Sequence, residues 1–219
     1  MTPAGLLFTA LGFLSGCAVL TWAAGRRGLH WTTIQALLLV AVWGGVLGAY
    51  GLQSAVGPPG RTILGGLLGG WLAVEVWKKR RGLRRSTGDL FALAVPAAEF
   101  WGRLGCYCNG CCYGVPWNGP WAIWQHECWR QPTQLYASGL ALLIFALMLW
   151  QFRAAPNVEG RMFGMYLILG GAARFAVEGL RVGSPAVLGL RPTQWLCLAL
   201  IVVGIRILRR RGSPLQGGG

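Results

Sequence analysis

The stretch GLLFTALGFLSGCAVLTWAA, from Gly5 to Ala24, decides the fold class of this chain. It holds 20 residues and no charged side chain. About 20 apolar residues in an α-helix cover the roughly 30 Å of hydrocarbon in a bilayer, so the stretch predicts a membrane-spanning helix. The GRRG that follows offers no small-residue cleavage pattern, so we expect this helix to be retained rather than removed as a signal peptide.

The rest of the chain has the same character as this first run. Of 219 residues, 54% are hydrophobic and 12% are charged, about half the charged fraction of a typical soluble domain. The 35 glycines lie inside apolar runs, as they do in closely packed membrane helices. We predict an all-α, polytopic membrane protein, a single transmembrane domain over residues 1–219, with about seven transmembrane helices near 5–24, 33–53, 62–77, 88–105, 135–152, 162–180 and 192–208.

The positive charge of the chain indicates its orientation rather than a nucleic-acid partner. The net charge is +14, and the basic residues cluster in short stretches between apolar runs, such as Lys78 to Arg85 and Arg209 to Arg211. This is the positive-inside pattern, whereas a nucleic-acid-binding protein carries its charge on a soluble face. With the N-terminus outside and the C-terminus in the cytoplasm, fourteen of the 20 basic residues fall on the inner side. We therefore predict that orientation and exclude nucleic acid.

The positive-inside pattern does not account for six arginines, which are Arg61, Arg103, Arg130, Arg174, Arg181 and Arg191. Two of them, Arg103 and Arg174, lie within or at the end of apolar runs. A charge at such depth is costly, so it usually pairs with protein or binds an anion. Arg174 and Glu178 are spaced i, i+4 on one helix, which leaves mutual neutralisation and ligand binding equally open. For Arg103 the nearest acidic residue is Glu99, and we favour a ligand.

A cysteine-rich segment separates the fourth and fifth predicted spans. Residues 106–133 contain CYCNGCCYG and four tryptophans, which suit the headgroup level of a membrane, so we expect an ordered extracytoplasmic loop. Disulfides are the first interpretation in an oxidising compartment, a reactive thiol is the second, and a metal site with His126 is the third. The spacing matches no standard zinc pattern, and we expect neither a metal nor a cofactor. The five cysteines concerned are Cys106, Cys108, Cys111, Cys112 and Cys128.

Three segments, in the correct order along the chain, resemble the motifs of a known enzyme family. GRLGCYCNGCCYG at 102–114 resembles G-R-x-G-N-F-x-N-G-E-x-x-G, and QPTQLYASGL at 131–140 resembles H-P-[ST]-Q-L-Y-E. GMYLILGGAARFAVEGLR at 164–181 is similar to a family helix that ends in R-F-x-x-E-x-x-R. A weaker match, TILGGLLGG at 62–70, resembles S-F-H-G-G-L. The family that these segments resemble is the prolipoprotein diacylglyceryl transferase family, and the resemblance covers nearly the whole chain.

The resemblance implies a multi-pass enzyme of the bacterial inner membrane. It implies phosphatidylglycerol as the donor and a thiol acceptor such as the cysteine of a lipoprotein precursor. A guanidinium group can bind the donor phosphate bidentately, and Glu178 would orient Arg174. Carried over by motif position, the substrate-binding residues are Arg103, Asn109, Gly110, Tyr136, Arg174 and Glu178.

The chain departs from the family motifs mainly at proton-handling positions. Cys106 and Cys111 stand in place of asparagine and glutamate, and Leu64, Gln131 and Ala137 replace two histidines and a glutamate. A cysteine can act as a nucleophile, and a nearby arginine favours its thiolate. We therefore expect the catalytic residues to be Arg103, Cys111 and His126. The alternative is a catalytically impaired lipid-binding relative whose outer loop is held by disulfides.

Overall fold

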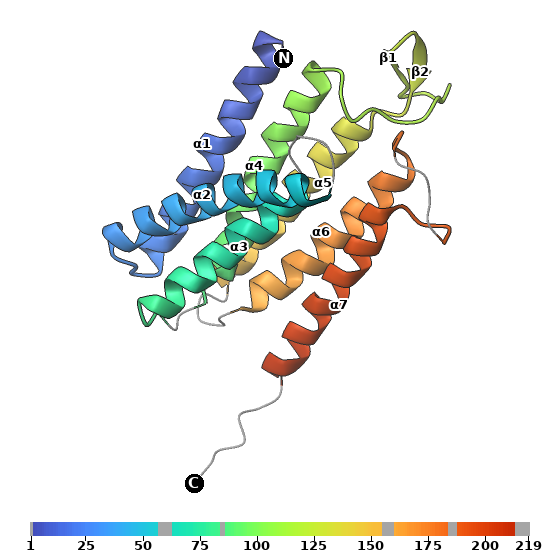
Figure 1. Ribbon diagram of the computed structural model, residues 1–219. Helices are drawn as coiled ribbons and strands as arrows, with labels where there is room; N and C mark the ends of the chain where they lie inside the picture. The colour runs from blue at the N-terminus through green and yellow to red at the C-terminus, as the bar shows by residue number, and fades with distance from the viewer. Residues whose placement is uncertain (1, 57–62, 84–85, 155–159, 184–187, 213–219) are drawn as a thin grey trace. The chain divides into compact units, whose positions relative to one another are not determined.

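The computed structural model describes residues 2–56, 63–83, 86–154, 160–183 and 188–212. Within these ranges the chain forms seven α-helices and one antiparallel hairpin (Figure 1). Each strand of the hairpin has three residues, so the all-α prediction is confirmed. The elements are α1 (Pro3–Arg26), α2 (Trp31–Val56), α3 (Ile63–Arg80), α4 (Gly88–Cys108), β1 (Ile123–Gln125), β2 (Cys128–Arg130), α5 (Thr133–Ala154), α6 (Arg161–Gly179) and α7 (Pro192–Gly212).

Four of the described helices, α1, α2, α5 and α7, are long and apolar enough to cross a bilayer. The other three helices, α3, α4 and α6, each carry at least three charged residues. Two of these charges, Asp89 in α4 and Glu178 in α6, are buried against protein rather than exposed. The described chain therefore confirms a mainly helical protein with four candidate spans, but not the predicted seven.

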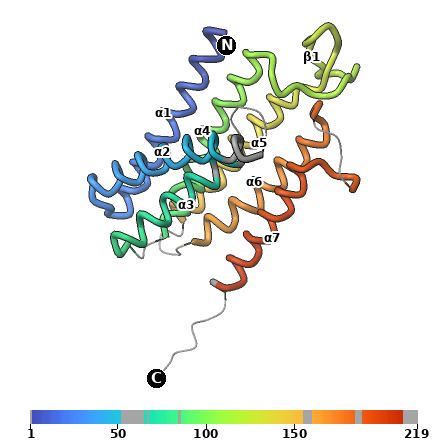
Figure 2. The backbone as a smooth tube through the Cα atoms, viewed as in Figure 1, coloured from blue at the N-terminus to red at the C-terminus, as the bar shows by residue number. Residues whose placement is uncertain are grey.

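The chain divides into two compact units, and the smaller one comprises residues 21–85. In this unit α2 and α3 run side by side (Figure 2). A Cβ added to Gly48 would lie only 2.7 Å from the Cα of Gly69, closer than real Cβ atoms approach. Glycines therefore let the two backbones touch, as small residues do between membrane helices.

The larger unit comprises residues 1–20 and 86–219 and contains α4 to α7. Helix α1 packs on α4 through glycine, since a Cβ on Gly12 would lie 2.9 Å from the carbonyl oxygen of Ala98. Helices α6 and α7 also meet closely, since a Cβ on Gly204 would lie 2.7 Å from the carbonyl oxygen of Gly164. Consecutive helices from α4 to α7 alternate in direction (Figure 1). The single domain expected over 1–219 stays a prediction.

A buried carboxylate sets the alignment of α4 with α6. Asp89, in the first turn of α4, accepts hydrogen bonds from the backbone N–H groups of Gly160 at 2.6 Å and Phe163 at 2.9 Å. These N–H groups belong to the start of α6, where no intrahelical acceptor exists. Because the two helices start together and run the same way, their last turns also lie at one end of the unit. The candidate site is built there.

Candidate active site

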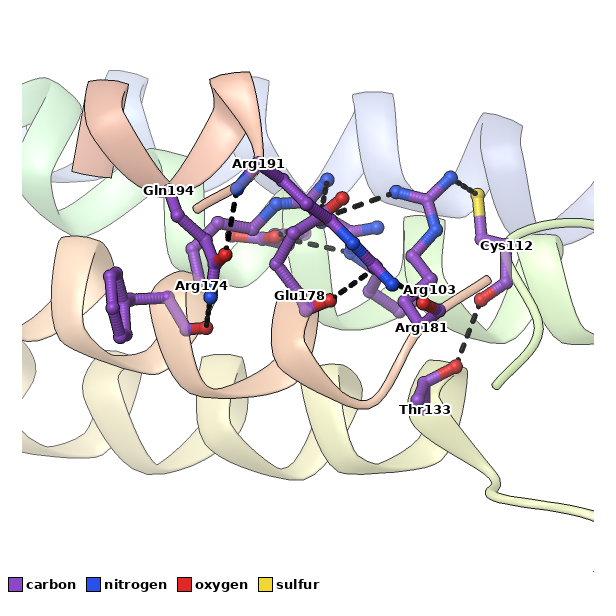
Figure 3. A network of polar contacts seen from close by, with 10 residues as sticks. Arg103, Cys112, Thr133, Arg174, Glu178, Arg181, Arg191 and Gln194 are labelled. Carbon is purple, nitrogen blue, oxygen red and sulfur yellow. Dashed lines mark hydrogen bonds and ion pairs between the residues drawn. The ribbon is translucent and has the colours of Figure 1, made fainter. Parts of the chain in front are cut away.

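Four arginines gather where α4 and α6 end and α7 begins (Figure 3). Arg103 comes from the last turns of α4 and Arg174 from α6, while Arg181 follows α6 and Arg191 directly precedes α7. All four belong to the set that the positive-inside pattern left unexplained. We call them, with Glu99 and Glu178, the arginine cluster.

Two carboxylates hold three of these guanidinium groups. Glu99 accepts two hydrogen bonds at one oxygen from Arg103, at 2.8 and 3.1 Å. One oxygen of Glu178 lies 3.3 Å from a nitrogen of Arg174 and 3.6 Å from a nitrogen of Arg181. Arg103 is therefore not a lone cation, because Glu99 lies one helical turn before it.

The arginine cluster keeps an excess of positive charge despite these pairs. It contains four guanidinium groups and two carboxylates, and the charges of Arg103 and Arg181 repel that of Arg174. The Arg174 and Arg181 side chains are 23% and 24% exposed, whereas Glu178 is 6% exposed. The Nε of Arg181 is buried without a hydrogen-bond partner among the described residues. Such an arrangement attracts an anion.

A narrow pocket opens beside the cluster between α4, α5 and α6. Its polar lining consists of Glu99 and Arg174, and its apolar lining includes Leu140, Ile144 and Val177. Glu99 and Arg174 thus face the same small cavity as these apolar side chains.

Arg191 connects the start of α7 to the end of α6, which carries part of the arginine cluster. Its guanidinium donates to the carbonyl oxygen of Glu178 at 2.6 Å and to that of Arg181. These carbonyls lie at the C-terminal end of α6, where cationic side chains satisfy unpaired acceptors. Gln194, in the first turn of α7, accepts the backbone N–H of Arg191 at 3.0 Å. The start of α7 therefore holds the end of α6.

Next to the arginines, three cysteines meet at the end of α4. The helix ends in a Schellman motif, in which Cys111 N–H donates to the Cys106 carbonyl and Gly110 N–H to the Tyr107 carbonyl. Gly110 has φ of 63°, which glycine adopts without strain, and Cys112 has φ of 62°, which is unusual for a residue with a side chain. The reversal brings Cys111 and Cys112 back beside Cys106.

The start of α5 holds this reversal in place. Thr133 donates through its hydroxyl to the carbonyl oxygen of Cys112, and Gln134 donates through Nε2 to that of Cys111, both at 2.9 Å. Both side chains are about 1% exposed, so they are positioned by packing. The PTQ of the second motif thus positions the cysteines of the first motif.

The Sγ atoms of Cys106, Cys111 and Cys112 all lie within 4.8 Å of one another, and we call them the thiol cluster. All seven cysteines lie in the described part of the chain and all are free. The predicted disulfides are therefore absent from this structure. Because α4 continues to Cys108, the predicted loop is also shorter at both ends and covers residues 109–132.

The thiol and arginine clusters are joined through Arg181, whose Nη2 donates to the Cys112 sulfur at 3.2 Å. A hydrogen bond from the Cys106 thiol and, next, the charge of Arg181 lower the pKa of the Cys112 thiol well below its usual range. The more exposed Cys111 behaves differently, since desolvation raises the pKa of its thiol. Among the three thiols, Cys112 is therefore the one whose surroundings favour the thiolate.

Other predicted site residues support the loop. Asn109 accepts hydrogen bonds from the backbone N–H and hydroxyl of Thr2, at 2.9 and 3.2 Å. The hydroxyl of Tyr136 donates to Gln131 at 2.9 Å. His126 lies in the hairpin turn with Nε2 2.7 Å from the carbonyl oxygen of Gly110, and its ring contacts Tyr113. Of the predicted residues, the arginine cluster brings together Arg103, Arg174 and Glu178.

The sequence did not single out Arg181, Arg191 and Cys112 as site residues. Arg181 and Arg191 were among the six arginines that the positive-inside pattern leaves unexplained. That signal could have pointed to them as site residues. Cys112 gave no such signal, because nothing in its spacing distinguishes it from Cys108. Arg130, the fifth such arginine within the described ranges, instead donates to loop carbonyls and stacks on Tyr113, while Arg61 lies outside the described residues.

Comparison with known proteins identifies the family. The family model described as prolipoprotein diacylglyceryl transferase matches residues 5–210. The chain belongs to this family.

Relatives agree with the family match over most of their length. A phosphatidylglycerol–prolipoprotein diacylglyceryl transferase of Clostridium tetani is 31% identical, over 90% of this chain and 88% of the relative. The protein of the same description from Nitratidesulfovibrio vulgaris is 32% identical, over 95% of this chain and 89% of the relative. A protein of the same description from Azoarcus is 36% identical, over 75% of this chain and 66% of the relative.

As a member of the prolipoprotein diacylglyceryl transferase family, the chain gathers its three best motif matches at one site. The first motif supplies Arg103 and the thiol cluster, the second supplies Thr133 and Gln134, and the third supplies Arg174 and Glu178. Segments separated by up to about 80 residues in the sequence therefore act as one structural group.

Proposed function

We propose that this chain transfers the diacylglyceryl group of phosphatidylglycerol to the cysteine thiol of a lipoprotein precursor in the bacterial inner membrane. The observation that carries the proposal is the arginine cluster, with four guanidinium groups around two carboxylates. The family membership and the names of the relatives support this substrate pair.

In the proposed reaction the acceptor thiol releases its proton to water, and its sulfur attacks the glyceryl carbon that carries the phosphate. A carbon–sulfur bond forms, the carbon–oxygen bond breaks, and glycerol phosphate leaves with the electron pair. Negative charge grows on the leaving phosphate, so prepositioned guanidinium groups lower the barrier most at that point. We assign this role to Arg103 and Arg174.

Glu99 and Glu178 hold the guanidinium groups in place before the lipid binds. Each pair is formed within one helix at i, i+4 spacing, so the arginines are oriented without a ligand. A phosphate can then share these guanidinium groups, because each arginine has five N–H donors and a carboxylate uses two at most.

We infer that the N-terminus and the cysteine loop lie outside and the C-terminus lies in the cytoplasm. The N-terminal Thr2 bonds to Asn109 at the loop end of the larger unit. Exposed basic residues at the opposite end of its helices support an inner side there, and they are Arg153, Arg161, Arg206, Arg209 and Arg210. Labelling of Cys111 in intact spheroplasts by a membrane-impermeant thiol reagent tests this orientation, and labelling only after lysis would contradict it.

Complementation tests the activity. In cells depleted of their own transferase, the chain should restore lipidated lipoprotein, measured by mass spectrometry of a reporter lipoprotein. Arg103→Ala should reduce transfer by about 100-fold or more, as loss of a group that stabilises transition-state charge does. The matched control is Arg153→Ala, which removes an exposed arginine at the far end of α5 and should leave transfer unchanged.

Failure of the wild-type chain at normal membrane levels would refute the transferase activity. Co-purification of phosphatidylglycerol without turnover would instead identify the lipid-binding relative considered from the sequence.

A further inference from the structure

The thiol cluster has the composition of a soft-metal site. Its donors, Cys106, Cys111 and Cys112, are three sulfur atoms within 4.8 Å of one another. Thiolates bound to Zn²⁺ at about 2.3 Å lie roughly 3.8 Å apart in a tetrahedron. The sulfur atoms of the cluster are thus at most about 1 Å further apart than in that geometry.

Three parts of the fold position these donors: the last turn of α4, the Schellman motif that follows it, and the start of α5. Cys106 is carried by the last turn of α4, and the Schellman motif with Gly110 turns the chain back onto it. Thr133 and Gln134 then hold the carbonyls of Cys112 and Cys111. Cys112 keeps a left-handed conformation that a cysteine rarely adopts, and such residues concentrate at functional sites. The side chains are therefore prearranged before any ligand binds.

The surroundings fit the charge of such a complex. Three thiolates and one divalent cation carry a net charge of −1, and the guanidinium of Arg181 donates to the Cys112 sulfur at 3.2 Å. Hydrogen bonds to ligating atoms are the usual outer contacts of protein metal sites. Cys111 is exposed, so the fourth coordination position can be reached from outside the protein.

We propose that Cys106, Cys111 and Cys112 bind a thiophilic divalent cation of the Zn²⁺ class, with an open fourth position that takes the thiol of the acceptor polypeptide. Three protein ligands and one open position are the arrangement of catalytic rather than structural zinc sites. The second part rests on the proposed function, since it concerns the acceptor of that reaction.

Coordination would supply the proton handling that the replaced family residues no longer provide. The acceptor thiol releases its proton to water when its sulfur binds the cation, because coordination favours the thiolate. The bound sulfur then forms the bond to the glyceryl carbon, the carbon–oxygen bond breaks, and the electron pair leaves with glycerol phosphate. The cation keeps its charge throughout. Arg181 joins the two clusters, so the thiolate forms beside the guanidinium groups that hold the phosphate.

Metal binding is tested on the full chain in detergent or nanodiscs, purified under reductant and stripped with a chelator. Titration with Co²⁺ should give one ion per chain and the charge-transfer absorption of thiolate ligands. Cys111→Ser and Cys112→Ser should each weaken binding by more than about 100-fold, since even outer-contact mutations cost 10 to 100-fold. The matched controls are Cys108→Ser and Cys128→Ser, which remove free thiols outside the cluster and should retain full binding.

The open position is tested with a lipobox peptide added to the Co²⁺-loaded protein. A cysteine peptide should raise the charge-transfer intensity by about one third, as expected for a change from three thiolates to four. The same peptide with serine in place of cysteine should not change it. This spectroscopic result does not require turnover, so it separates failure of the metal site from failure of the transferase activity.

Several outcomes would overturn the proposal. They are the absence of stoichiometric binding, binding that survives both Cys111→Ser and Cys112→Ser, and a disulfide within the cluster in freshly prepared protein. An unchanged spectrum with the cysteine peptide would overturn the role of the fourth position.

Discussion

Asp89 and Glu178 are both buried carboxylates of the same helix bundle, yet their partners differ in kind. Asp89, at the start of α4, accepts backbone N–H groups of Gly160 and Phe163 at 2.6 and 2.9 Å. Glu178, at the end of α6, faces the side chains of Arg174 and Arg181 at 3.3 and 3.6 Å. Backbone donors cannot leave without unfolding a helix end, whereas guanidinium groups can be shared with a ligand.

The difference separates a structural end of the bundle from a functional end. At the Asp89 end the bonds are short and the carboxylate is fully buried. At the Glu178 end the ion pairs are longer, one Glu178 oxygen makes no hydrogen bond to any residue that the structure describes, and positive charge is in excess. A buried ion pair contributes little net stability, so the second end is suited to exchange partners with an anion.

The largest effect should come from Asp89→Ala. It leaves the buried N–H of Gly160 and the partly buried N–H of Phe163 without this acceptor, which should lower the free energy of unfolding by about 2–5 kcal/mol. SDS-induced unfolding followed by circular dichroism measures the loss. Asp89→Asn, which keeps one acceptor oxygen, should lose less. Wild-type stability in Asp89→Ala would contradict a structural role for this end.

Arg174→Ala should affect transfer more than stability. Loss of one group that stabilises the leaving phosphate should reduce the rate by about 100 to 1,000-fold, or about 2.7–4 kcal/mol of transition-state stabilisation. The assay is release of glycerol phosphate from phosphatidylglycerol with a lipobox peptide, and Arg174→Lys should retain part of the rate. If the unfolding midpoint falls as far as in Asp89→Ala, the two ends do not differ in the way described.

Glu178→Gln should have a smaller effect than Arg174→Ala. Whereas loss of an arginine weakens anion binding, this variant should strengthen it. Removing one negative charge increases the positive excess, so inorganic phosphate should inhibit transfer at about fivefold lower concentration, about 1 kcal/mol. Inhibition curves for wild type and variant give the ratio. Weaker inhibition in the variant would show that Glu178 orients the arginines more than it competes with the ligand.

The smallest effect should be a change in the alkylation rate of Cys112 in the Arg181→Gln variant, measured on metal-free protein. Arg181 lowers the pKa of the Cys112 thiol, so its loss should raise that pKa and shift the pH at half-maximal alkylation upward. Alkylation at neutral pH should slow a few-fold, measured by mass spectrometry of the modified peptide. Cys128, outside the cluster, serves as the internal control. An unchanged pH profile of alkylation would show that Arg181 does not influence the Cys112 thiol.

Much of the fold was predictable because it depends on local properties. Helix positions follow from apolar runs, and α5 at Thr133–Ala154 lies within a few residues of the predicted 135–152. The charged helices were harder, since α4 and α6 each carry three charged residues and do not qualify as spans by composition, although one charge in each, Asp89 and Glu178, is buried. The sequence singled out Arg103 and Arg174 because a charge inside an apolar run requires an explanation, and their role in lipid binding stays a prediction.

The amino-acid sequence by itself determined the helical membrane-type chain, its family and the arginines that belong to no inner loop. These follow from hydropathy and from residue types at fixed spacing. Only the tertiary structure decided that Arg191 binds the end of α6, that Thr133 and Gln134 position Cys112 and Cys111, and that the thiols meet instead of pairing. Such contacts join segments far apart in sequence, and their geometry depends on the alignment of α4 with α6.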